Sequence, residues 1–71
     1  MNIDKYQPMH LRLKKGMLIG IKINQKMTTA LVVSDVYAVS NMQFNIIDII
    51  SQGQKRKFRT SWVKEIYCEL G

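Results

Sequence analysis

The segment from residue 43 to residue 60 constrains the fold more than any other part of the chain. Two strand-like stretches, IIDII and KRKFR, flank the residues Gln52 and Gly53. Glycine takes a positive φ without steric cost, and a two-residue hairpin turn needs a positive φ at its second position. The pattern therefore predicts an antiparallel hairpin with strands at residues 43–50 and 55–60.

A two-residue turn also fixes which residues face each other. The predicted pairs are Ser51 with Gln54, Ile49 with Arg56, Asp48 with Lys57 and Ile47 with Phe58. Because successive side chains of a strand point to opposite faces, Phe58 is expected on the core face, with Lys55, Lys57 and Arg59 on the other. Asp48 and Lys57 are expected to form a cross-strand ion pair.

Shorter patterns on either side complete an all-β prediction. Apolar residues alternate with others over residues 17–23, which predicts a strand, and a β-branched stretch at 29–36 predicts a second after a polar break at 24–28. The TSWV segment, residues 60–63, predicts a short helical turn around Ser61–Val63 in which Trp62 or Val63 closes the core, and a last strand follows. The core is expected to contain Leu31, Val33, Ile47, Ile49 and Phe58.

These elements fit one small barrel of four to five antiparallel strands over residues 14–71. Residues 1–13 are expected to form an N-terminal arm or an edge strand. A chain of 71 residues has room for a single domain with a small core. Its 46% hydrophobic and 23% charged residues are typical of a globular protein.

The residues that usually carry catalysis or bind metals are scarce. A lone Cys68 and a lone His10 provide neither a disulfide within the chain nor a zinc cluster, so no cofactor or metal is expected. Cys68 is expected to be an inert thiol that is buried or half-buried. Asp35 and Asp48 fall on opposite faces of the predicted sheet, whereas acid–base catalysis needs converging groups, so an enzyme is not expected.

The absence of paired cysteines is typical of a reducing cytosol. The N-terminal segment lacks the apolar run of a signal peptide, and no stretch approaches the roughly 18 apolar residues of a membrane span. The expectation is a cytoplasmic protein that does not associate with membranes.

The net charge of +6 and the pI of about 9.8 favour a polyanionic partner. The cations expected to contact nucleic acid are Lys55, Arg56, Lys57, Arg59 and Lys64, with Arg12, Lys14 and Lys15 beside them. A second basic cluster consists of Arg12, Lys14, Lys15, Lys22 and Lys26, and it would join the first if the first strand lies near the last. Phe58 and Trp62 are expected in the core, although an exposed aromatic side chain could stack on a base.

The second and third predicted strands are apolar on both faces. The apolar residues opposite the predicted core are Val32, Val36, Phe44, Ile46 and Ile50. Either the strands bend so that both rows turn inward, or the N-terminal arm covers this second row, or another protein does. The third alternative makes the row a candidate interface with a second copy of the chain or with a host protein.

The order of these motifs resembles a known class of small barrels. A Lys14-Lys15-Gly16 start, an ALVV strand, an SQGQ hairpin turn and a TSWV turn before the last strand are similar to SH3-like barrels of the KOW and Tudor type. They look most like the short single-barrel proteins encoded by bacteriophages, over about residues 14–68. The resemblance implies a non-catalytic binding module.

Charge and resemblance together predict a protein that binds DNA or RNA through a cationic strand, and the resemblance implies a phage protein in the host cytoplasm. The alternative is a small adaptor or inhibitor that docks onto an acidic host protein. A small-molecule substrate is not expected.

Overall fold

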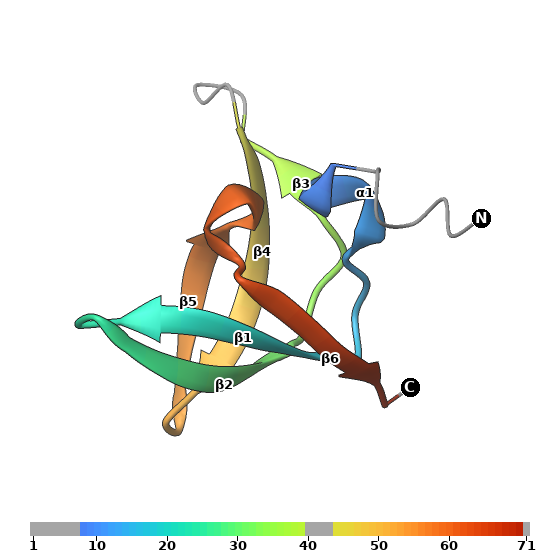
Figure 1. The fold of residues 1–71 in the computed structure, drawn as a ribbon. Coiled ribbons are helices and arrows are strands. Elements are labelled where there is room, and N and C mark those ends of the chain that lie inside the picture. Colours follow the sequence, from blue (N-terminus) through green and yellow to red (C-terminus); the bar gives the residue numbers. More distant parts are fainter. Residues whose placement is uncertain (1–7, 40–43, 71) are drawn as a thin grey trace.

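The computed structural model describes residues 8–39 and 44–70, most of which form strands. In chain order the elements are α1 (Met9–Arg12), β1 (Met17–Ile23), β2 (Lys26–Val32), β3 (Tyr37–Ala38), β4 (Asn45–Ser51), β5 (Gln54–Arg59), the 3-10 helix η2 (Thr60–Trp62) and β6 (Glu65–Glu69) (Figure 1). The predicted all-β class is confirmed. Residues 1–7 of the expected arm and Gln43 of the expected third strand lie outside the described residues.

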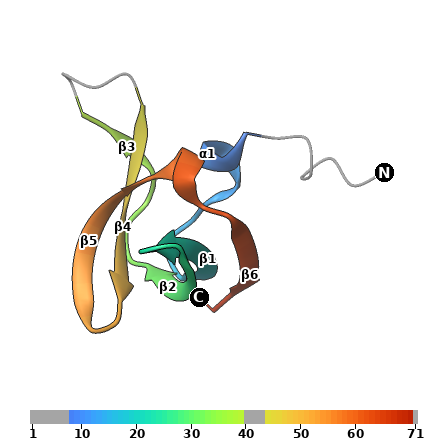
Figure 2. The same ribbon diagram turned by 60° about the vertical axis from the view of Figure 1, so that its left-hand side comes forward.

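The strands form one antiparallel sheet in which the first strand lies beside the last. The order is β3-β4-β2-β1-β6, and β5 pairs with β4 along its other edge. β2 pairs with the end of β4 and β3 with its beginning, so the two short strands share one edge of β4. Figure 2 shows the curled sheet, with the β4–β5 hairpin arching away from β1 and β2.

The β4–β5 hairpin has the predicted register throughout. Ser51 pairs with Gln54, Ile49 with Arg56, Asp48 with Lys57, and Ile47 with Phe58. Both turn residues have positive φ, 54° at Gln52 and 76° at Gly53. This is the geometry that suits the right-handed twist of the flanking strands.

The β1–β2 hairpin differs from the prediction at its turn. The expected polar break at residues 24–28 is only two residues long, because Asn24 and Gln25 take positive φ values of 52° and 66°. β2 therefore begins at Lys26 and ends at Val32 instead of covering residues 29–36. Gln25 stands where hairpin turns usually carry glycine, so the sequence gives no strong signal for this turn.

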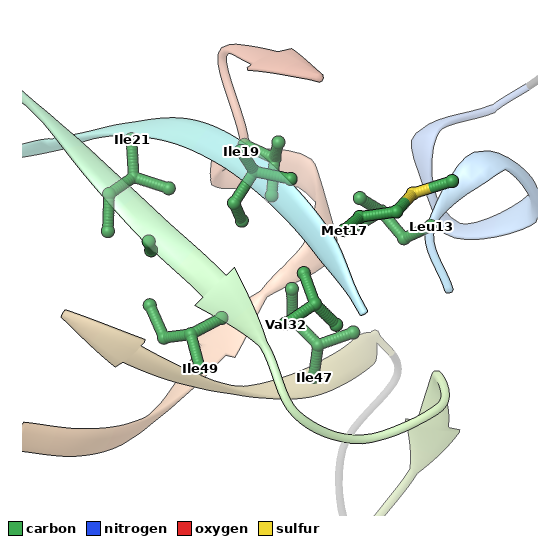
Figure 3. Packing of buried hydrophobic residues seen from close by; sticks show 9 residues of the cluster. Leu13, Met17, Ile19, Ile21, Val32, Ile47 and Ile49 are labelled. Atoms are coloured by element: carbon green, nitrogen blue, oxygen red, sulfur yellow. The ribbon is translucent and has the colours of Figure 1, made fainter. Parts of the chain in front are cut away.

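The core lies inside the curl of the sheet (Figure 3). Its buried members are Leu13, Met17, Ile19, Ile21, Ala30, Val32, Ile47, Ile49 and Val63. Phe58 and Ile66 are partly buried against this cluster, as the predicted alternation requires. Val63 closes the end of the core, whereas Trp62 is 49% exposed.

The prediction for the second strand was wrong by one residue. Val32 pairs with Ile49 and Leu31 with Ile50, and directly paired residues share a face, so Val32 is in the core and Leu31 is not. Val33 is only partly buried. The chain bends between β2 and β3, and a register counted back through that bend comes out on the wrong face.

The segment before β1 is part of the folded domain. Residues 9–12 form one helical turn rather than an edge strand, and Leu13 is buried beside Met17 (Figure 3). Met9 also packs against the core. The boundary expected at residue 14 therefore falls inside the packed structure.

Candidate nucleic-acid interface

A cleft of about 390 Å³ opens between β1, β5 and η2. The residues that line it are Lys22, Ile23, Arg56, Phe58, Trp62 and Lys64. Its volume lies within the usual range for small-ligand clefts, roughly 300–1,000 Å³. Half of its lining residues are cations, and none of the described residues that line it is acidic.

Three local features bring these cations together. The tight turn at Asn24 and Gln25 leaves Lys22 and Ile23 at the end of β1. Alternation along β5 puts Arg56 on the same face as Phe58. The backbone N–H of Lys64 donates a 2.8 Å hydrogen bond to the carbonyl oxygen of Gly20, which holds the link between η2 and β6 against β1.

The apolar part of the cleft is aromatic. The rings of Phe58 and Trp62 pack edge to face, with centroids 5.4 Å apart and an interplanar angle of 79°. The prediction that both rings belong to the core was right in part for Phe58 and wrong for Trp62. In the three-residue turn of η2, Thr60 and the following Val63 take the buried positions, which leaves the indole between them at the surface.

Arg59 is held by aromatic rings. Its guanidinium carbon lies 3.7 Å from the centroid of the Phe44 ring and 4.9 Å from that of the Trp62 ring. These are cation–π distances. A smaller hollow of about 280 Å³ lies beside this arrangement, and Ile46 is among the residues that line it.

Lys55 and Lys57 lie on the face of β5 opposite the cleft, as predicted. Asp48 and Lys57 are paired across the strands, and the hydroxyl of Tyr37 joins their side chains. This hydroxyl donates a 2.7 Å hydrogen bond to Oδ1 of Asp48 and accepts one of 3.1 Å from Nζ of Lys57. The bond to Tyr37, with the nearby negative charge of Asp48, raises the pKa of Lys57.

The second basic cluster does not gather in one place. Lys22 lines the cleft, whereas Lys14 and Lys15 precede the opposite end of β1. At about 3.3 Å per strand residue, Lys15 and Lys22 are roughly 23 Å apart along the chain. Arg12 belongs to α1, next to this distant end. The cleft therefore unites Arg56 and Lys64 with Lys22, which was not among the nucleic-acid contacts predicted from the sequence.

Most residues of the predicted apolar interface are covered by the rest of the chain, so the prediction of an exposed apolar row was wrong for them. Val32 and Ile46 are 1% and 5% exposed, and Val36 packs against the core. The ring of Phe44 is half-buried under Arg59. Val32 is buried because its register puts it on the core face, and Arg59 lies over the ring of Phe44, so their own chain covers these residues.

Ile50 is 41% exposed and belongs to a different apolar face. The register places it beside Leu31, which in turn pairs with Leu18, and Leu18 pairs with Cys68 of β6. These four side chains lie on the outer side of the sheet. Cys68 is exposed, contrary to the prediction, because β6 is an edge strand with only its inner face against the core.

Residues 8–39 and 44–70 contain no group of three His, Cys, Asp or Glu side chains placed to hold a metal ion. Neither of the described helices is long and apolar enough to cross a membrane. Comparison of the chain with protein-family models, with curated proteins and with solved structures found no match.

Proposed function

We propose that the protein is a non-enzymatic module that binds nucleic acid in the cleft between β1, β5 and η2. The observation that carries the proposal is the meeting of Lys22, Arg56 and Lys64 around an exposed indole. The cations neutralise phosphates and release their counterions, which gives an affinity that falls steeply with salt and depends little on sequence.

The remaining cations contribute in a different way. Lys14, Lys15, Lys55 and Lys57 are exposed but lie away from the cleft lining. They add to the net charge of +6 and so attract a polyanion over a distance, which raises the association rate. Arg59 orders the aromatic rings rather than binding a phosphate.

We also propose that the curled sheet is an SH3-like barrel of the kind that the sequence resembles. The pairing of β1 with β6 and the 3-10 turn between β5 and β6 support this architecture. The resemblance also supports a phage-encoded protein that acts in the host cytoplasm. An experimental structure in which Ile19 and Ile66 are not neighbours would contradict the barrel.

The test of binding uses a labelled oligonucleotide and two charge-matched variants. The cleft variant carries Lys22→Glu, Arg56→Glu and Lys64→Glu, and the distal variant carries Lys14→Glu, Lys15→Glu and Lys55→Glu. Each reversal removes two positive charges, so both variants go from +6 to zero. Fluorescence anisotropy should show a much larger loss of affinity for the cleft variant, and an equal loss in both would refute the site.

A second candidate function is docking onto an acidic protein through the outer face of Leu18, Leu31 and Ile50. Lys55 pairs with Ile50 and borders this apolar face, and the whole chain carries a net charge of +6. Such a surface complements a partner surface that has an apolar patch with an acidic rim. A photo-crosslinker on Cys68 tests it, because Cys68 lies on the same face. If the Ile50→Asp variant still gives the crosslinked product, this docking mode is contradicted. A product of twice the 8.3 kDa chain mass would indicate a homodimer instead.

A further inference from the structure

We infer that the cleft takes single-stranded nucleic acid, with one base stacked on the indole of Trp62 and the flanking phosphates on Lys22, Arg56 and Lys64. The inference rests on the proposed function and specifies the form of nucleic acid and the mode of contact. It assigns Trp62 a role that neither charge nor folding requires.

The side chain of Trp62 is unusually exposed for a tryptophan. Tryptophan is highly buried on average, yet 49% of this side chain is accessible in a domain whose core is small. Its neighbours Thr60 and Val63 are 4% and 5% exposed, so the turn has buried positions that the indole does not occupy. An exposed aromatic ring inside a cationic cleft is the usual platform for an unpaired base.

The indole is also held in place before any ligand binds. The guanidinium of Arg59 lies over the ring at 4.9 Å, and Phe58 packs against it at nearly a right angle. Arg59 is itself fixed by Phe44. A ring that is already ordered loses less side-chain entropy on binding, which favours affinity.

The cleft around the ring is lined by positive charge from several parts of the chain. Lys22 comes from β1, Arg56 from β5 and Lys64 from the link to β6, so the cations that line the cleft with the indole come from three segments of the chain. A strand whose base lies on Trp62 has phosphates on either side of that base. In a duplex the bases are stacked on each other and paired, so stacking on the protein requires a single strand or an extruded base.

Trp62 is the chain's one tryptophan, so its fluorescence reports directly on this contact. The full chain is titrated at low salt with oligothymidylate of about 12 nucleotides, a length within the usual site sizes for single-stranded binding. An abasic oligomer of the same length supplies the same phosphates without bases. A duplex of the same length supplies bases that are already stacked.

The expected result is saturable quenching by the oligothymidylate, with little quenching by the abasic oligomer or the duplex. Binding of all three with equal affinity and no quenching would overturn the stacking inference and leave the proposed function intact. Failure of all three to bind would refute both.

Substitution of Trp62 provides the second measurement. With a labelled oligothymidylate, Trp62→Ala should weaken binding about 5- to 150-fold, the range that corresponds to the loss of one stacked base. Trp62→Phe keeps an aromatic face and should retain most of the affinity. Circular dichroism and a thermal melt confirm that each variant is folded. Equal affinity of folded Trp62→Ala and the unmodified chain would contradict the inference.

Discussion

The hydroxyl of Tyr37 donates a 2.7 Å hydrogen bond to Oδ1 of Asp48, eleven residues further along the chain. The backbone of Asp48 is tied to the same region, since its N–H donates to Oγ of Ser34 and its carbonyl accepts from the N–H of Val33. These bonds hold the bend between β2 and β3 against β4. They also place the Tyr37 hydroxyl within 3.1 Å of Nζ of Lys57.

Tyr37→Phe should therefore destabilise the fold. The substitution removes one hydroxyl that makes two hydrogen bonds, and a net loss of about 0.5–1.5 kcal/mol is expected for a bond of this kind. Urea unfolding followed by circular dichroism measures it. Tyr67→Phe is the matched control because it removes the same atom from a half-exposed tyrosine of β6. Equal effects of the two substitutions would contradict the role of Tyr37.

Lys57 should make stability depend on alkaline pH. Its pKa is raised in the folded state, first by the hydrogen bond to Tyr37 and then by nearby negative charge. A raised pKa means that folding favours the protonated form, so this stabilisation is complete below the ordinary lysine pKa and is lost as pH rises through the raised value. The unfolding free energies of the unmodified chain and Lys57→Gln should converge in that alkaline window. Parallel curves would refute the coupling.

Gly53→Ala should destabilise the β4–β5 hairpin by about 1 kcal/mol. An added Cβ meets nothing within 4 Å, so the cost comes from the backbone, whose φ of 76° disfavours an L-residue with a side chain. The converse change, Gln25→Gly, relaxes the φ of 66° in the other hairpin and should stabilise the chain. Thermal unfolding measures both, and shifts of the same sign would contradict the turn geometry.

Neighbouring isoleucines of β4 should respond very differently to truncation. Ile49 is 0% exposed and Ile50 is 41% exposed. Ile49→Ala should cost roughly 2–5 kcal/mol because it removes buried methyl groups and leaves a cavity, whereas Ile50→Ala should cost well under that. Chemical denaturation of the two variants compares them. Similar losses would mean that the register of β4 against its neighbours is wrong.

The parts of the fold that the sequence predicted are those set by short-range geometry. The turn at Gln52 and Gly53 determined every pair of the β4–β5 hairpin, because a two-residue connection leaves no freedom in register. The alternation of residues 17–23 likewise gave the bounds of β1. In both cases a local rule was sufficient.

The errors arose where a long connection or a curved surface decides the outcome. Val32 took the core position expected for its neighbours because the bend before β3 breaks the alternation. The cleft combines Lys22 with Arg56 and Lys64, which are more than thirty residues away in sequence, and the strand pattern alone does not place them together. Trp62 was assigned to the core by residue type, whereas the geometry of a three-residue 3-10 turn exposes it.

The salt dependence of oligonucleotide binding shows how many phosphates the cleft neutralises. Each cation that neutralises a phosphate of a single strand contributes about −0.7 to the slope of log K against log salt concentration. Reversing the charges of Lys22, Arg56 and Lys64 should therefore reduce the slope by about 2, while the distal variant at Lys14, Lys15 and Lys55 should keep a slope near that of the unmodified chain. A slope unchanged in the cleft variant, or reduced equally in both, would contradict the assignment of phosphate binding to the cleft.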